Sequence, residues 1–238
     1  MHPQSLDQEN TYSPPRYSYG ALLFFLVVMI TCVPVLREQS ESSVVMELGI
    51  TGVLLFSVYS LSYLPRVRWW AFSLALITVI ENWILHVHFS KALYLAAYLC
   101  NLGFFLLVIA VIASNIFRSR RVDINVILGA ICIYLLACIA WALAYGLVEG
   151  LYPGSFYLNG SPIAHPMDVL RVRVLLSDFI YFSIVTFTTL GYGDFLPFTS
   201  LTRILAALEA VSGQLYVAIV LARLMGIYLQ NTATKNII

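Results

Sequence analysis

The 238-residue chain is 61% hydrophobic and only 11% charged, whereas soluble domains carry about 25% charged residues. A water-soluble fold of this length could not bury so much apolar surface, so the composition predicts an integral membrane protein. The formal net charge of +1 argues against nucleic-acid binding as a main role.

The chain begins with a polar, proline-containing segment, residues 1–18, expected to form a short cytoplasmic tail. Six apolar stretches follow, and each is long enough to cross a hydrocarbon core of about 30 Å as a helix. They are 19–36, 44–64, 69–88, 93–117, 124–147 and 201–229. No cleavage site follows the first, so it is interpreted as a retained span. Short loops join the first five, which predicts an all-α, antiparallel membrane bundle.

Basic residues predict the orientation of the bundle, because they are enriched in cytoplasmic loops. With a cytoplasmic N-terminus, eight lie inside: Arg16, Arg66, Arg68, Arg118, Arg120, Arg121, Arg223 and Lys235. Five lie outside: Arg37, Lys91, Arg171, Arg173 and Arg203. Both termini are therefore expected in the cytoplasm, with 230–238 as a C-terminal tail and 148–200 on the outer side.

The outer segment divides into two parts. Residues 149–168 are rich in glycine, proline and polar residues and are expected to form an extracellular turret. Asn159-Gly160-Ser161 matches a glycosylation pattern, but such a short pattern often arises by chance, and a proline follows it. Ser177-Asp178 predicts a helix start, with a capping hydroxyl and an acid in the first turn. A helix from there to Thr188 would span about 16 Å, half a bilayer, with its negative C-terminal end at the membrane centre.

The most informative motif follows directly: Thr189-Leu190-Gly191-Tyr192-Gly193, then Asp194. The run TTLGYGD resembles the selectivity filter of potassium channels. A dehydrated K⁺ needs a cage of oxygens, which rings of backbone carbonyls from four such strands can supply. Glycines at alternate positions admit the dihedrals that point successive carbonyls inward. The resemblance implies K⁺ binding at Thr189, Leu190, Gly191 and Tyr192, with Asp194 at the outer mouth.

One chain supplies one filter strand, so a pore requires several copies, and a cyclic homotetramer is the simplest closure. The resemblance extends over a pore domain, 122–229, with outer helix, re-entrant pore helix, filter and inner helix. It implies a hinge at Gly213, for which close helix packing is an equal alternative. It also implies cavity or gate positions at Val217, Leu221, Met225 and Leu229. Tyr181 and Phe182 stand where this family often has two tryptophans.

The preceding four-helix segment, 19–121, resembles voltage-gated channels only in architecture. The stretch 93–117 contains no arginine or lysine, so we expect little or no voltage dependence. Glu81, Asn82, His86 and His88 form either a proton sensor or a polar cluster that fixes helix packing. Glu209 is expected to bond to the pore helix, with packing or a proton-linked gate as its role. Anionic lipid binding is considered for Arg118, Arg120, Arg121 and Arg223, with snorkelling as the simpler role for Arg223.

No hydrolase, zinc-protease or nucleotide-binding motif occurs in the sequence, so no enzyme activity or cofactor is expected. The sequence therefore favours a potassium-selective channel in the plasma membrane, with K⁺ as the permeant ion. Three alternatives remain open: a non-selective cation channel, a potassium transporter subunit, and a membrane sensor or subunit that modulates partner channels.

Overall fold

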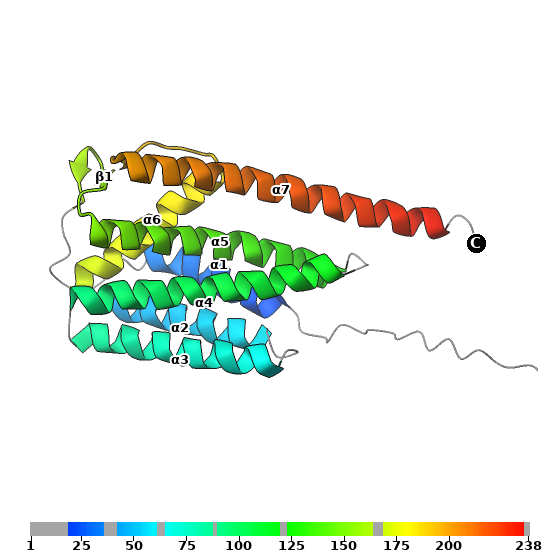
Figure 1. Ribbon diagram of the computed structural model, residues 1–238, viewed down its shortest axis with the longest axis horizontal. Coiled ribbons are helices and arrows are strands. Elements are labelled where there is room, and N and C mark those ends of the chain that lie inside the picture. Colours follow the sequence, from blue (N-terminus) through cyan, green and yellow to red (C-terminus); the bar gives the residue numbers. More distant parts are fainter. Residues whose placement is uncertain are drawn as a thin grey trace, which may run out of the picture.

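The computed structural model describes residues 19–35, 42–60, 65–87, 90–119, 123–163 and 169–235. Five helices follow one another and alternate in direction, as the short loops predict (Figure 1). They are α1 (Tyr19–Val35), α2 (Ser42–Ser60), α3 (Pro65–Val87), α4 (Lys91–Arg118) and α5 (Ile124–Leu151). Asp123 caps α5, because its side chain accepts a hydrogen bond of 2.7 Å from the backbone N–H of Ile124.

Three helices among the described residues are long and apolar enough to cross a membrane: Lys91–Arg118, Ile124–Leu151 and Ser200–Gly226. Shorter apolar segments lie in the other helices: Tyr19–Cys32, Gly49–Val58, Ala71–Glu81 and Leu176–Phe187. The chain is thus an integral membrane protein with several candidate spans. The count of six spans stays a prediction.

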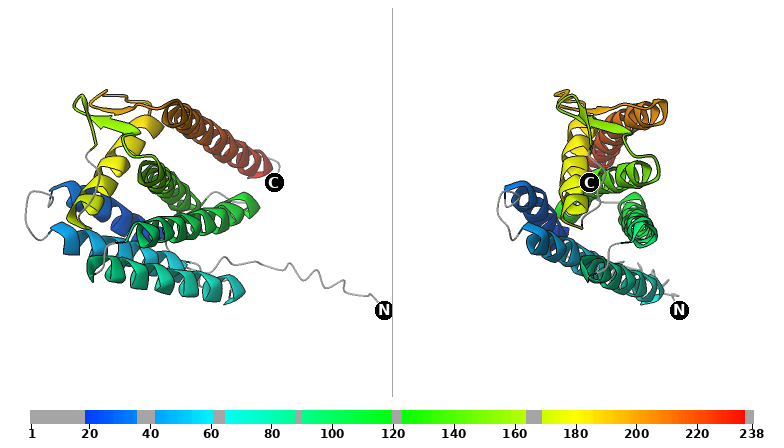
Figure 2. Two further views of the ribbon diagram at one scale, coloured as in Figure 1. Left: turned by 60° about the vertical axis from the view of Figure 1, so that its left-hand side comes forward. Right: turned by 90° about the vertical axis from the view of Figure 1, so that its left-hand side faces the viewer.

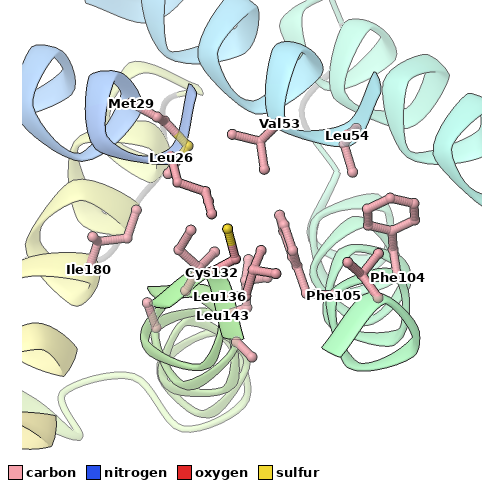
Figure 3. Close-up of a cluster of buried hydrophobic side chains, with 14 of the residues drawn as sticks. Leu26, Met29, Val53, Leu54, Phe104, Phe105, Cys132, Leu136, Leu143 and Ile180 are labelled. Atoms are coloured by element: carbon pink, nitrogen blue, oxygen red, sulfur yellow. The ribbon is translucent and has the colours of Figure 1, made fainter. Parts of the chain in front are cut away.

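The helices share one hydrophobic core (Figure 3). α1 contributes Leu26 and Met29, and α2 contributes Val53 and Leu54. Phe104 and Phe105 of α4 lie opposite them, and the cluster continues through Cys132, Leu136 and Leu143 of α5 to Ile180. The segments 19–121 and 122–229 therefore pack against each other through a continuous apolar interior.

The expectation of an all-α fold is wrong in one place, because two strands of the predicted turret form a small antiparallel sheet with a third strand that precedes α7. Its strands, in the order β2-β1-β3, are β1 (Phe156–Leu158), β2 (Ser161–Pro162) and β3 (Phe195–Pro197). Asn159 and Gly160 form the two-residue loop between β1 and β2, with φ of 51° and 79°. Positive φ at both positions is typical of the type I′ turns that match the twist of a hairpin.

Two further helices complete the chain: α6 (Val169–Phe187) and α7 (Ser200–Lys235). α6 crosses the bundle obliquely and ends beside the middle of α7, from which the chain returns to the start of α7 (Figures 1 and 2). The predicted helix start at Ser177-Asp178 is wrong, because the helix begins at Val169 and both residues are buried inside it. Residues 169–176 contain no glycine or proline, so nothing in them interrupts the helix.

Candidate functional site

The segment Thr189–Asp194 connects the C-terminal end of α6 to β3. The last turn of α6 holds its beginning, since the N–H of Thr189 bonds to the carbonyl of Thr186 at 2.9 Å. The N–H of Leu190 bonds to the carbonyl of Val185 at 2.8 Å. The segment therefore starts from a fixed point at the end of a helix, where the partial charge of the helix dipole is negative.

The backbone of this segment alternates between two regions of φ/ψ space. Thr189, Gly191 and Gly193 have φ of 59°, 62° and 82°, whereas Leu190 and Tyr192 between them do not have positive φ. In an ordinary strand successive carbonyls point to opposite sides, whereas left-handed backbone at every second residue allows them to turn toward the same side. This is the backbone that the sequence predicts for Gly191 and Gly193.

Thr189 is the unusual member of the alternation, because a β-branched residue rarely adopts positive φ. Such a conformation costs about 1–3 kcal/mol and persists only where the surroundings impose it. Its side chain is held from α7, since Nε2 of Gln214 donates to the Thr189 hydroxyl oxygen at 3.2 Å. Gln214 was not predicted as a site residue, although a polar residue next to Gly213 in an apolar helix could have indicated a specific contact.

The outer end of the segment is fastened at Asp194. Its carboxylate accepts a hydrogen bond of 2.8 Å from the hydroxyl of Tyr181 on α6. Its backbone carbonyl accepts one of 2.9 Å from the N–H of Asn159 in the hairpin turn. The side chain of Asp194, the residue predicted at the outer mouth, is thus hydrogen-bonded to α6. The backbone N–H of Asn159 therefore links the hairpin turn to the end of the segment.

The hairpin is in turn tied to the outer ends of α5 and α7. The buried carboxylate of Glu149 accepts hydrogen bonds from the N–H groups of Gly154 and Ser155, at 2.6 and 2.9 Å. The carbonyl of Ser155 accepts from the Phe198 N–H at 2.9 Å and from the Thr202 hydroxyl at 3.1 Å. The segment Thr189–Asp194 is therefore fixed at both ends to helices of the same chain.

An aromatic cluster packs behind the segment. Tyr145, Phe156, Phe179, Phe182 and Phe195 contact one another with ring centroids 4.9 to 6.4 Å apart. They come from α5, β1, α6 and β3, so the cluster joins these four elements to one another. Tyr181 and Phe182, which stand where the resembled family often has two tryptophans, have different roles. Phe182 belongs to this buried cluster, whereas Tyr181 is exposed and bonds to Asp194.

In the single chain, the side of the segment away from this cluster is open. All six residues from Thr189 to Asp194 are exposed, including Leu190 at 55% and Tyr192 at 68%. Large apolar side chains of this kind are seldom left in contact with water. This side of the segment therefore presents apolar surface that lipid or another protein surface can cover.

α7 has one face toward its own chain and an open apolar face. Val217, Leu221, Met225 and Leu229 are 50 to 61% exposed and recur at every fourth position, so they form one stripe. On the opposite side, the hydroxyl of Tyr216 donates to the carbonyl of Ala130 on α5 at 2.6 Å. The stripe continues below Gln214, on the side of α7 that reaches the Thr189 hydroxyl.

Gly213 lies where α7 touches the end of α6. A Cβ added there would stand 2.3 Å from the backbone oxygen of Phe187, far inside van der Waals contact. α7 continues as an α-helix through this position. Close packing, one of the two roles considered, thus accounts for the glycine in this structure, and the hinge stays a prediction.

Glu209 is fully buried one turn before Gly213 and connects three helices. The hydroxyl of Tyr145 on α5 and that of Ser183 on α6 form short hydrogen bonds with its two carboxyl oxygens. The Ser183 hydroxyl also donates to the carbonyl of Cys138 on α5 at 2.7 Å. The expected bond to the pore helix is therefore present.

Arg223, for which snorkelling toward headgroups is the simpler prediction, binds backbone carbonyls at the end of α4 in this structure. Its guanidinium donates to the carbonyls of Ile116, Phe117 and Ser119, at 2.9, 2.7 and 3.3 Å, and lies over the Phe117 ring. These groups stand at the C-terminal end of α4, where carbonyls lack helical partners and attract cations. Of the other arginines considered for lipid binding, Arg118 is exposed, whereas Arg120 and Arg121 lie outside the described residues.

The remaining predicted polar cluster is described only in part. The Cys100 thiol on α4 donates a hydrogen bond of 3.6 Å to Oε1 of Glu81 on α3. The side chains of Asn82 and His86, and all of His88, lie outside the described residues. Within the described part of the chain, no cluster of histidine, cysteine and acidic side chains could hold a metal ion.

The comparisons with known proteins agree with this geometry. Residues 131–230, which include α6 and the segment Thr189–Asp194, match the family described as "Ion channel". Over 51 residues, the chain is 45% identical to two-pore potassium channel 4 of Arabidopsis thaliana. This stretch covers 21% of this chain and 18% of that relative. The match thus spans less than a fifth of the relative's length. No solved structure matches the chain. The chain contains an ion channel domain and is not an enzyme.

Proposed function

We propose that this protein is a potassium-selective channel in which Thr189, Leu190, Gly191, Tyr192 and Gly193 form the filter. K⁺ passes along its electrochemical gradient and exchanges its water shell for backbone carbonyls and the Thr189 hydroxyl. The observation that carries the proposal is the alternation of left-handed backbone at positions 189, 191 and 193. It directs oxygens to one side of a segment fastened at both ends.

The proposed assembly is a homotetramer. Four oxygens around an ion form a ring only when four segments converge, and each chain contributes one. The exposure of Leu190 and Tyr192 supports this arrangement, because neighbouring copies would cover them. The open face of α7 supports it further, since its apolar side chains would line the cavity or contact the next copy.

In the tetramer, the stripe Val217, Leu221, Met225 and Leu229 faces the ion path below the filter. An apolar constriction at its lower end can close the pore by dewetting. The proposed orientation has both termini in the cytoplasm of the plasma membrane and the turret outside. Because α4 contains no arginine or lysine between its first and last residues, voltage dependence is weak or absent.

The test is cation flux from liposomes that contain only the purified chain. With a K⁺ gradient, the wild-type protein releases K⁺ and retains Na⁺. Gly191→Val forces a β-branched side chain into φ of 62° and abolishes K⁺ flux. Gly103→Ala on α4 is the matched control, because an added Cβ there meets nothing within 4 Å, and it conducts like the wild type.

The alternatives predict different results in the same assay. Equal release of K⁺ and Na⁺ would identify a non-selective cation channel. No release by a folded, purified chain would favour a subunit that modulates partner channels or acts as a sensor. Either result would overturn the proposal.

A further inference from the structure

Beyond the filter itself, the structure contains a buried polar junction between the three helices of the ion channel domain. The junction consists of Glu209 on α7, Ser183 on α6, and Tyr145 and Cys138 on α5. All four residues are fully buried and have no solvent-exposed surface. The carboxyl group of Glu209 is therefore shielded from bulk solvent in the folded chain.

The electrostatic surroundings of Glu209 are unfavourable to a negative charge. Its two hydrogen-bond partners, Tyr145 and Ser183, are neutral hydroxyls, and the thiol of Cys138 is the other titratable group nearby. The two arginines whose side chains are described on α7 are engaged elsewhere, Arg203 at the carbonyl of Pro197 and Arg223 at the end of α4. A buried carboxylate without a cation takes up a proton rather than remain charged.

The count of hydrogens at the junction leads to the same conclusion. Three contacts each need one hydrogen: Tyr145 to Glu209, Ser183 to Glu209, and Ser183 to the Cys138 carbonyl. Tyr145 and Ser183 supply one hydrogen each. The third can come from the carboxyl group of Glu209. A protonated Glu209 gives one unbroken chain: Tyr145 donates to Oε2, Oε1 donates to Ser183, and Ser183 donates to Cys138.

We infer that Glu209 is a neutral carboxylic acid that positions the pore helix α6 between α5 and α7. Ser183 lies one turn before the end of α6, and Val185, two residues later, accepts the N–H of Leu190 in the filter segment. A displaced Ser183 would therefore move the acceptor from which the filter begins. This link to conduction rests on the proposed function, whereas the protonation of Glu209 does not.

The first arm of the test is infrared spectroscopy of the full-length protein in lipid. Wild type is expected to show the C=O stretching band of a protonated carboxylic acid near neutral pH, with the small shift that exchange into D₂O produces. Glu209→Gln removes this band. Glu81→Gln is the matched control, because Glu81 ends the apolar segment Ala71–Glu81 and contacts Cys100 on α4 rather than the junction, so this change leaves the Glu209 band in place. A spectrum without a band sensitive to Glu209→Gln would refute the neutral acid.

The second arm compares K⁺ over Na⁺ selectivity in liposomes. Glutamine resembles a protonated acid, because its oxygen can accept from Tyr145 while its amide donates to Ser183. Glu209→Gln is expected to keep selectivity within about twofold of wild type, and Glu209→Leu, which fills the space without bonding, to lower it roughly tenfold. Equal selectivity in the glutamine and leucine variants would overturn the positioning role. If no variant conducts while the acid band is present, the proposed function fails and the neutral acid stands.

Discussion

The contact between Gly213 and the end of α6 gives the sharpest prediction. A Cβ at Gly213 would lie 2.3 Å from the backbone oxygen of Phe187, and real Cβ contacts stay above 3.0 Å. Gly213→Ala thus forces a displacement of at least 0.7 Å (3.0 − 2.3). The obstacle is backbone, so it cannot move aside by a rotamer change. The displaced group stands two residues before Thr189.

The magnitude follows from two opposing effects. Overpacking costs about 1–3 kcal/mol, and we expect the upper end here because backbone must yield. Replacing glycine by alanine inside a helix stabilises the helix by about 1 kcal/mol. The expected net loss is about 2 kcal/mol per chain, which is roughly a thirtyfold change in the folding equilibrium. The filter should lose selectivity along with stability, because its starting point is displaced.

The assay is thermal unfolding of the purified protein together with K⁺ and Na⁺ flux. Gly226→Ala on the same helix and Gly103→Ala on α4 are matched controls, since an added Cβ meets nothing within 4 Å at either position. Both controls should unfold at the wild-type temperature or slightly above it. A Gly213→Ala variant with wild-type stability and altered opening would refute the packing argument and favour the hinge.

Three further predictions concern contacts around the filter and the inner helix. Tyr181→Phe removes the bond to the Asp194 carboxylate and should lower stability by about 0.5–1.5 kcal/mol in chemical denaturation, with weaker K⁺ selectivity. Gln214→Leu leaves the Thr189 hydroxyl without its donor and should weaken K⁺ binding about two- to tenfold in calorimetric titration. Arg223→Met leaves the last carbonyls of α4 uncapped, at a cost of about 1–3 kcal/mol, and should accelerate hydrogen exchange in that turn.

Each of these three has a result that would count against it. For Tyr181, unchanged selectivity would show that the bond from the Asn159 N–H suffices to hold this end of the filter segment. For Gln214, K⁺ binding at wild-type strength would remove the amide from the site. For Arg223, the control is Arg118→Met at the same end of the bundle, whose side chain is exposed. Equal exchange in both variants would contradict the capping role.

Much of the architecture is predictable because it depends on local signals. Long apolar stretches predict helices, and α1 to α5 and α7 occur close to the expected bounds. The left-handed backbone at Gly191 and Gly193 is predictable, because glycine is the residue that most readily adopts positive φ and the two glycines occupy alternate positions. The hairpin was also within reach, since Asn159-Gly160 between Phe156–Leu158 and Ser161 is a strong two-residue turn signal. In the sequence analysis that dipeptide was weighed only as part of a glycosylation pattern, which was discounted as a chance match, and the turn was not predicted.

The remaining features depend on contacts between distant segments, which a single sequence does not reveal. The start of α6 was misplaced because Ser177 and Asp178 form a good capping pair, yet the uninterrupted run before them continues the helix. Arg223 was expected near lipid because the sequence does not reveal its partners, one of which is a backbone carbonyl 107 residues away. The hydrogen-bonded junction at Glu209 joins residues 26 and 64 positions apart, so only the fold brings them together.

The most direct test of the central claim is the reversal potential of the purified chain in a planar bilayer, with KCl on one side and NaCl on the other. The account predicts a current that reverses far toward the K⁺ equilibrium potential, because only K⁺ is well matched by the carbonyl oxygens of Thr189 to Gly193. A reversal potential near zero, with Na⁺ carrying as much current as K⁺, would contradict it.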